Sequence, residues 1–131
     1  GIVDCEDSCP LGDFDNDGRI DLVVTQNGSK TRLFRNQQQR RGLRVRLNAG
    51  PMNETGIGAL IQVDNGMGFG AAREVHGGAG YWSQNSAVQV VDGEAKRIRV
   101  RWPGGEERVS VIPSGAIEIL IGRDGKVEKT R

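Results

Sequence analysis

The sequence predicts an all-β chain, and three observations support this prediction. Hydrophobic residues make up 36% of the chain, aromatic residues only 5%, and glycine contributes 20 residues, as in proteins built from short strands and turns. Apolar and charged residues alternate in several runs, which is typical of strands with one buried face. Turn-forming pairs separate these runs at intervals of about 8–12 residues, as in a β-sandwich or barrel.

Residues 1–41 are expected to contain one hairpin. A β-branched apolar run at 20–25 predicts the first strand, and residues 31–35 predict the second. The Asn27-Gly28 pair between them is a strong hairpin-turn signal. Residues 36–41 are polar and predict an exposed linker, so we place a domain boundary after residue 41. One hairpin is too small to bury a core by itself.

Residues 42–131 are expected to form a small antiparallel β-sandwich or barrel. Apolar residues alternate with arginines at 43–47 and at 97–102, which predicts two half-buried strands. Further strands are expected at 59–63, 72–76, 87–91, 108–112, 116–121 and 126–129. Turn signals such as Asn65-Gly66, Asp92-Gly93 and Asp124-Gly125 separate them. No segment shows the apolar period of a helix.

The most informative motif is an aspartate-rich loop at residues 13–21. Carboxylates stand at its relative positions 1, 3, 5 and 9, which are Asp13, Asp15, Asp17 and Asp21. Gly18 supplies a sharp turn at position 6, and Arg19 at position 7 would offer its backbone carbonyl. Hard oxygen ligands at alternate positions suit calcium, so the loop predicts a calcium site.

The loop has two alternative interpretations. An EF-hand requires a glutamate at position 12, where this chain has Val24 within a predicted strand, so the EF-hand is excluded. The other alternative is an ordinary turn without a metal. Four carboxylates so close together would repel one another without a cation, which favours calcium. No nearby histidine or cysteine suggests zinc or iron.

Two segments resemble known families. The loop at 13–22, together with Leu33-Phe34-Arg35-Asn36, resembles the FG-GAP/VCBS calcium repeat of β-propeller blades. The remainder resembles the ASPIC and UnbV domain, through the blocks at 43–47, 56–59, 80–85 and 100–105. The chain departs from that family at 88–93, where a Phe-Gly-Leu-Gly-like step is usual.

This resemblance implies the C-terminal piece of a larger secreted or surface-exposed protein, similar to the cartilage acidic protein group, in which a calcium-binding propeller precedes the domain. It implies that Asp13, Asp15, Asp17 and Asp21 are calcium ligands. It transfers no catalytic residue to this chain. The expected partner is therefore the remainder of a larger propeller-containing chain.

A second candidate site is a set of arginines on the polar faces of two predicted strands, Arg44, Arg46, Arg97, Arg99 and Arg101. If these strands are neighbours, the guanidinium groups would line one surface and bind a polyanion such as a sulfated polysaccharide. The alternative is a solvated face neutralised by glutamates, which the net charge of +1 supports. Nucleic acid is not an expected partner, since the pI is only about 8.0 and no recognition motif is present.

The remaining candidates are weaker. Tyr81, Trp82, Gln84 and Asn85 combine aromatic and amide groups that would suit a sugar or small-molecule pocket, or a packed corner. Cys5 and Cys9 are spaced for a local disulfide or are two free thiols. His76 is the only histidine, and no nucleophile-elbow motif surrounds any serine.

These observations lead to one functional expectation and one alternative. The chain is expected to be a calcium-binding, non-catalytic adhesion or recognition module that is extracellular, periplasmic or at the cell surface. Its expected ligands are carbohydrate, a polyanion or another extracellular protein. Membrane insertion is not expected, because no apolar run approaches the ~20 residues of a spanning helix. The alternative is an accessory or catalytic part of a UnbV-type biosynthetic enzyme with a pocket near residues 81–85.

Overall fold

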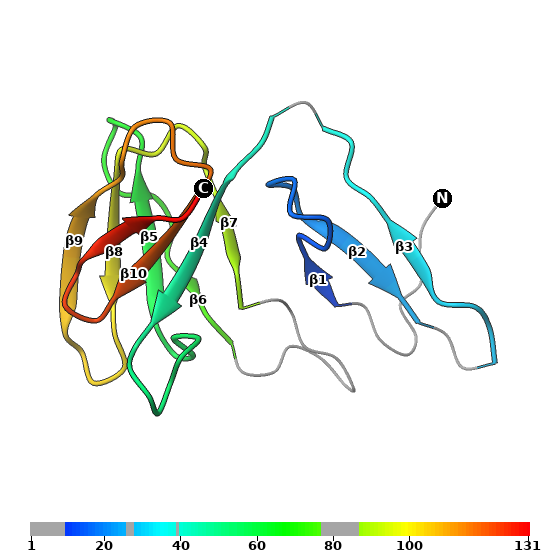
Figure 1. Cartoon of the computed structure of the whole chain (residues 1–131), viewed down its shortest axis with the longest axis horizontal. Helices are drawn as coiled ribbons and strands as arrows, with labels where there is room; N and C mark the ends of the chain where they lie inside the picture. Colours follow the sequence, from blue (N-terminus) through cyan, green and yellow to red (C-terminus); the bar gives the residue numbers. More distant parts are fainter. Residues whose placement is uncertain (1–9, 26–27, 39, 77–86) are drawn as a thin grey trace.

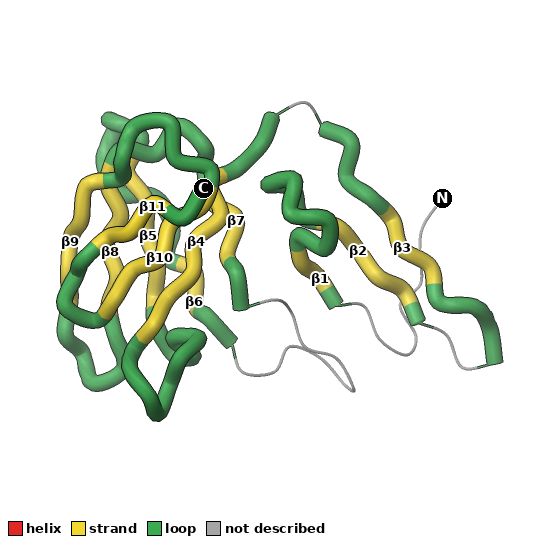
Figure 2. The backbone as a smooth tube through the Cα atoms, viewed as in Figure 1, coloured by secondary structure: helices red, strands yellow, loops and turns green. Residues whose placement is uncertain are grey.

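The computed structural model describes residues 10–25, 28–38, 40–76 and 87–131, and every regular element in these ranges is a β-strand (Figure 1). The strands are β1 (Leu11–Gly12), β2 (Asp21–Val24), β3 (Arg32–Phe34), β4 (Leu43–Asn48), β5 (Leu60–Asp64), β6 (Arg73–Glu74), β7 (Gln89–Val91), β8 (Arg97–Arg101), β9 (Glu107–Val111), β10 (Glu118–Gly122) and β11 (Val127–Lys129). Figure 2 shows these strands joined by loops and turns. The part of the chain described here contains no helix long and apolar enough to cross a membrane.

The first sheet is antiparallel and has the order β1-β2-β3. Leu22 of β2 faces Leu11 on one side and Phe34 on the other, so the pairing of the two predicted strands is confirmed. Gly28, between β2 and β3, has a positive φ of 75°. That conformation favours glycine and explains the turn signal. The short strand β1 was not predicted, because two residues are too few to show a periodic pattern.

The remaining strands form two four-stranded sheets that enclose one core. Their orders are β11-β10-β4-β7 and β6-β5-β8-β9. Buried residues of β4 and β10, such as Val45 and Ile119, form one apolar cluster with residues of β5 and β8, such as Ile61 and Ile98. Trp102, which is 1% exposed, completes this cluster. The prediction of an all-β sandwich is therefore confirmed, and the described sheets do not close into a barrel.

One part of the fold prediction was wrong. β4 and β10 are parallel, with Val45 opposite Ile119 and Leu47 opposite Ile121. The sheet β11-β10-β4-β7 is therefore mixed rather than antiparallel. Parallel neighbours require a long crossover connection. The chain supplies such a connection, because all four strands of the sheet β6-β5-β8-β9 lie between β4 and β10 in the sequence. Alternation of apolar residues reveals which face of a strand is buried but not the direction of its neighbour.

The first sheet lies beside the sandwich, next to β4 and β7 (Figure 1). The backbone makes this contact at Gly42, whose amide donates a 2.8 Å hydrogen bond to the carbonyl of Gly18. A Cβ atom at Gly42 would lie 2.6 Å from the carbonyl oxygen of Val91 and would collide with Val90. Only glycine therefore permits this close approach between the aspartate-rich loop, β7 and the start of β4.

Candidate metal centre

The aspartate-rich loop connects β1 to β2 and is shaped by hydrogen bonds between its own side chains and backbone. Both oxygens of Asp13 accept amide hydrogen bonds, from Asp17 at 2.9 Å and from Gly18 at 2.8 Å. Asn16 and Gly18 have positive φ values of 61° and 81°. Asparagine and glycine tolerate this conformation best, and aspartates readily accept hydrogen bonds from turn amides. The sequence therefore folds here into a tight loop around the carboxylate of Asp13.

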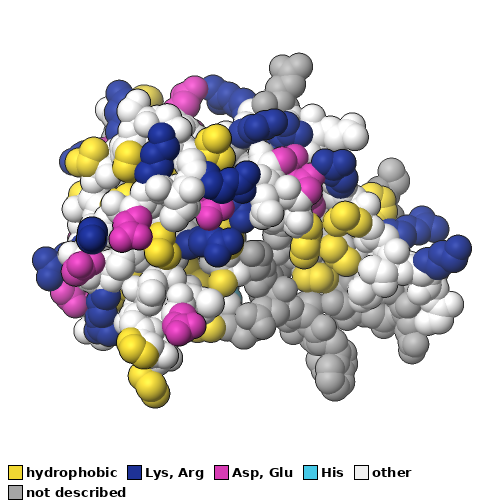
Figure 3. Space-filling view, viewed as in Figure 1, with side chains coloured by type: hydrophobic (Ala, Val, Ile, Leu, Met, Phe, Trp, Pro, Cys, Tyr) yellow, Lys and Arg dark blue, Asp and Glu magenta, His cyan; other side chains and the backbone are white. Residues whose placement is uncertain are grey.

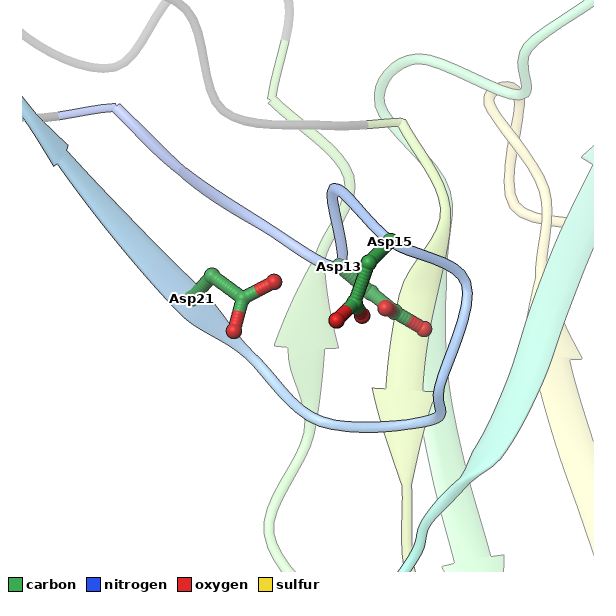
Figure 4. Close-up of side chains that lie close together, drawn as sticks. All are labelled: Asp13, Asp15 and Asp21. Carbon is green, nitrogen blue, oxygen red and sulfur yellow. The ribbon is translucent and has the colours of Figure 1, made fainter. Parts of the chain in front are cut away.

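Three of the predicted ligands converge in this loop. Asp13, Asp15 and Asp21 each place a carboxylate oxygen within 4.8 Å of the other two. Figure 4 shows the carboxylate of Asp21 reaching from β2 toward those of Asp13 and Asp15. Calcium ligands lie about 2.3–2.6 Å from the ion, so two of them are at most about 5 Å apart. The spacing of the three oxygens therefore fits a shared calcium ion.

The fourth predicted carboxylate ligand, Asp17, behaves differently. Asp17 accepts a 2.9 Å hydrogen bond from the amide of Arg19, and its second oxygen lies 3.3 Å from the Arg19 guanidinium. It belongs to the loop but not to the group of three carboxylates. The sequence pattern could not show that Asp17 pairs with Arg19 instead. An arginine two residues after an aspartate can face solvent as readily as it can form an ion pair with it.

Asp21 has the most unusual electrostatic environment in the loop. It is 1% exposed, and its two oxygens accept hydrogen bonds from the amides of Asn36 at 2.8 Å and Phe14 at 3.1 Å. Within the described ranges, no lysine, arginine or histidine forms an ion pair with it. A buried carboxylate is normally paired with a cation, because taking a charge out of water is costly. Asp21 is therefore the carboxylate of the three without a direct ion pair, although the charge of Arg35 acts on it from a longer distance.

The neighbouring carboxylates do have cationic partners. Arg35 donates hydrogen bonds to Asp15, and Arg44 donates one to Asp13. Burial alone would raise the pKa of Asp15, but the Arg35 guanidinium and the amide of Asp17 outweigh it and hold that pKa below its usual range. Asp15 is therefore ionised at neutral pH and available as a ligand.

Arg44 has a buried environment that the sequence did not reveal. It is 2% exposed, and its Nε donates a 2.7 Å hydrogen bond to Glu118, which is itself buried. Arg46 lies 3.2 Å from the other oxygen of Glu118. Burial would raise the pKa of Glu118, but the bond from Arg44 and the charge of Arg46 outweigh it, so this pKa is lowered. The alternating pattern predicted a solvent-facing Arg44, and the aspartate-rich loop covers it instead.

The structure does not bring the five predicted arginines onto one surface. The expectation depended on neighbouring strands, and this was wrong because β4 and β8 belong to different sheets. On the outer side of the sheet β6-β5-β8-β9, Arg97 forms an ion pair with Asp64. Nε of Arg99 lies 3.4 Å from a carboxylate oxygen of Glu107, and its Cζ lies 3.9 Å from the ring centre of Phe69. Arg101 at the end of β8 is exposed. On the face seen in Figure 3, basic and acidic side chains are interspersed over the sandwich rather than gathered in a continuous basic field.

Several other predicted residues fall outside the described ranges. These are the disulfide candidates Cys5 and Cys9 and the pocket candidates Tyr81, Trp82, Gln84 and Asn85. His76 is described and exposed, with Nδ1 4.0 Å from a carboxylate oxygen of Glu74.

The fold and the site together define an all-β protein in which a two-sheet sandwich lies against an aspartate-rich loop. The chain belongs to the ASPIC and UnbV family, whose model matches residues 49–124, more than half of its length. This match gives no positive indication of catalysis. No curated protein matches the chain. The match begins after β4 and ends before β11, although both strands belong to the sandwich. The structural domain is therefore larger than the matched region.

Proposed function

We propose that this chain is a calcium-binding, non-catalytic adhesion or recognition module that acts outside the cytoplasm. In this proposal Asp13, Asp15 and Asp21 hold the ion, Asp17 shapes the loop, and the backbone carbonyl of Arg19 is available as a further ligand. The ion would neutralise the loop and fix it against the sandwich, so its role is structural.

One observation carries the proposal, and it is the buried carboxylate of Asp21. Its side chain is almost fully enclosed, and no described lysine, arginine or histidine forms an ion pair with it, although the charge of Arg35 acts on it from a longer distance. Its oxygens lie close to those of two further aspartates. A divalent cation shared by the three would compensate this buried charge directly, whereas an empty site would leave it only two backbone amides and the more distant charge of Arg35.

The ligand chemistry favours calcium over other metals. All side-chain ligands are carboxylates, which suit hard cations rather than zinc or copper. Calcium also accepts backbone carbonyls and flexible geometry, whereas magnesium demands a near-ideal octahedron. Extracellular calcium modules bind with dissociation constants of about 10⁻⁴–10⁻³ M, so a site with three clustered carboxylates would be occupied outside cells.

The first sheet supports a relationship with β-propeller blades of the FG-GAP/VCBS type. It is small, and three of its apolar side chains are substantially exposed: Leu11 by 42%, Leu33 by 51% and Phe34 by 42%. Phe14 in the adjoining loop is exposed by 48%. Leu33 and Phe34 are consecutive in β3 and so lie on opposite faces of the sheet, which leaves exposed apolar side chains on both faces. We propose that further strands of a propeller cover them in the larger protein.

The proposal does not include a polyanion site made of the five arginines. Four of them have a carboxylate partner, and only Arg101 has none within the described residues. Paired charges in this arrangement give a surface of mixed sign. Carbohydrate or another extracellular protein is the proposed ligand class, and residues 81–85, on which the alternative of a biosynthetic enzyme rests, lie outside the described ranges.

Calorimetric titration of calcium into the chelated protein tests the calcium site. We expect one binding event with a dissociation constant at or below about 10⁻³ M. The Asp21→Asn variant should lose it, because the amide removes the buried charge while keeping the side-chain shape. The matched control is Asp124→Asn, which changes an exposed aspartate in a turn far from the loop. Absence of binding to the unmodified protein would refute the proposal.

A further inference from the structure

Arg44 connects the aspartate-rich loop to the centre of the sandwich. Its side chain is 3% exposed and lies between two buried carboxylates that come from distant parts of the chain. On one side Nη1 donates a hydrogen bond to Oδ2 of Asp13, the first residue of the loop. On the other side Nε donates a 2.7 Å hydrogen bond to Glu118. One guanidinium therefore holds a ligand of the proposed metal site and a residue of β10.

The sandwich side of this connection is rigidly placed. Arg44 and Glu118 are directly opposite each other in the parallel ladder of β4 and β10. The amide of Arg44 donates a 2.9 Å hydrogen bond to the carbonyl of Ile117, and Thr130 donates a hydrogen bond to Glu118 at 3.2 Å. The guanidinium is therefore anchored in the two central strands of the mixed sheet.

The loop side leaves room for a metal ion. An ionised carboxylate has about four acceptor positions. The described hydrogen bonds to the carboxylate of Asp13 use three of them, from Asp17, Gly18 and Arg44. A metal ion and Arg44 can therefore bind Asp13 at the same time, and each would fix the position of the carboxylate for the other.

We propose that Arg44 is a positioning residue that couples calcium binding in the aspartate-rich loop to the order of the β-sandwich. This inference rests on the proposed calcium site. Coupling between two sites is reciprocal, so an ion that fixes Asp13 also stabilises the Arg44–Glu118 pair, and a well-ordered β4–β10 pair strengthens ion binding.

The backbone hydrogen bond from Gly42 to Gly18 also joins the two parts, but it involves no carboxylate of the loop and no residue of β10. Other side-chain contacts do not provide the link either. The pair of Arg40 and Glu94 is largely exposed, with 88% and 74% of the side chains accessible, and exposed pairs contribute little. Arg46 also binds Glu118, but its side chain is 52% exposed and the structure shows no bond from it to the loop. Arg46 is therefore a matched control for Arg44.

Hydrogen exchange with and without calcium tests the coupling. In the unmodified protein, calcium should slow amide exchange both in the loop and in β4 and β10. In the double variant Arg44→Met with Glu118→Gln, which removes one charge of each sign, calorimetry should still detect calcium, but only the loop should be protected. The control Arg46→Met should behave like the unmodified protein. Protection of β4 and β10 that persists in the double variant, or is absent from the unmodified protein, would overturn the inference.

A second measurement keeps the inference testable if the double variant does not fold or calcium does not bind. Unfolding is measured in chelator for Asp13→Asn, Arg44→Lys and their combination. Lysine keeps the charge but cannot bridge two carboxylates as the guanidinium fork does. The two substitutions should be coupled by about tenfold or more in the unfolding equilibrium constant, as for contacting residues in one network. Independent effects would overturn the link, whereas a failure of calcium binding alone would overturn only the proposed function.

Discussion

Replacing Gly42 with alanine should destabilise the protein although it adds only one methyl group. The new Cβ would lie 2.6 Å from the carbonyl oxygen of Val91 and collide with the side chain of Val90, so β7 or the start of β4 must move. Forcing an extra carbon into a packed site costs about 1–3 kcal/mol. For a domain of this size, about 1 kcal/mol lowers the melting temperature by roughly 3–5 °C, so we expect a decrease of about 3–15 °C.

Gly70→Ala provides the matched control for this prediction. A Cβ at Gly70 would meet nothing nearer than the carbonyl oxygen of Val63 at 3.8 Å, which is an ordinary contact. This substitution should be neutral or stabilising by about 0.4–1 kcal/mol, because alanine restricts the unfolded chain. Both variants are compared by thermal and denaturant unfolding. Equal stability of Gly42→Ala and the unmodified protein would refute the close packing of the loop, β4 and β7.

Three further predictions concern charge, the core and the metal. The pKa of Asp64 is lowered by its bond from Arg97 and by the amide of Gly66, so its stabilising contribution is present above its unfolded pKa of about 3.8 and is lost as the pH falls further. The difference in unfolding free energy between the unmodified protein and Asp64→Asn should therefore shrink between pH 6 and pH 3, and a constant difference in urea titrations would contradict this assignment. Trp102→Ala should cost about 3–5 kcal/mol, because the side chain is 1% exposed in the core. Trp102→Phe should cost clearly less in the same denaturation assay, because Nε1 has no hydrogen-bond partner within the described part of the chain; equal losses would show that the indole is essential. Calcium at 100 times its dissociation constant should raise the stability by about 2.7 kcal/mol, and calorimetric scanning in chelator should show a melting temperature about 10 °C lower. An unchanged melting temperature would indicate that the ion does not bind the native state.

Alternation of apolar and polar residues was sufficient to locate most strands. Leu43, Val45 and Leu47 face the core as predicted, as do Ile98 and Val100. These positions could be predicted because the side-chain period of a strand depends only on local backbone geometry. The parallel pairing of β4 with β10 could not be predicted, because it depends on how the intervening chain builds a second sheet.

The candidate site shows the same limit. The spacing of Asp13, Asp15 and Asp21 predicted three carboxylates that the structure brings together, because all lie in or directly after one short loop. The partner of Asp13 could not be found in this way, since Arg44 lies on the far side of a linker and appeared to be a solvent-facing strand residue. Its burial results from the docking of the loop, and no local pattern encodes that contact.

A crystal structure of the protein grown in calcium, with anomalous scattering to identify the ion, tests the central claim most directly. The account predicts one calcium ion about 2.3–2.6 Å from carboxylate oxygens of Asp13, Asp15 and Asp21. An aspartate-rich loop without an ion at millimolar calcium, or an ion bound elsewhere, would contradict it.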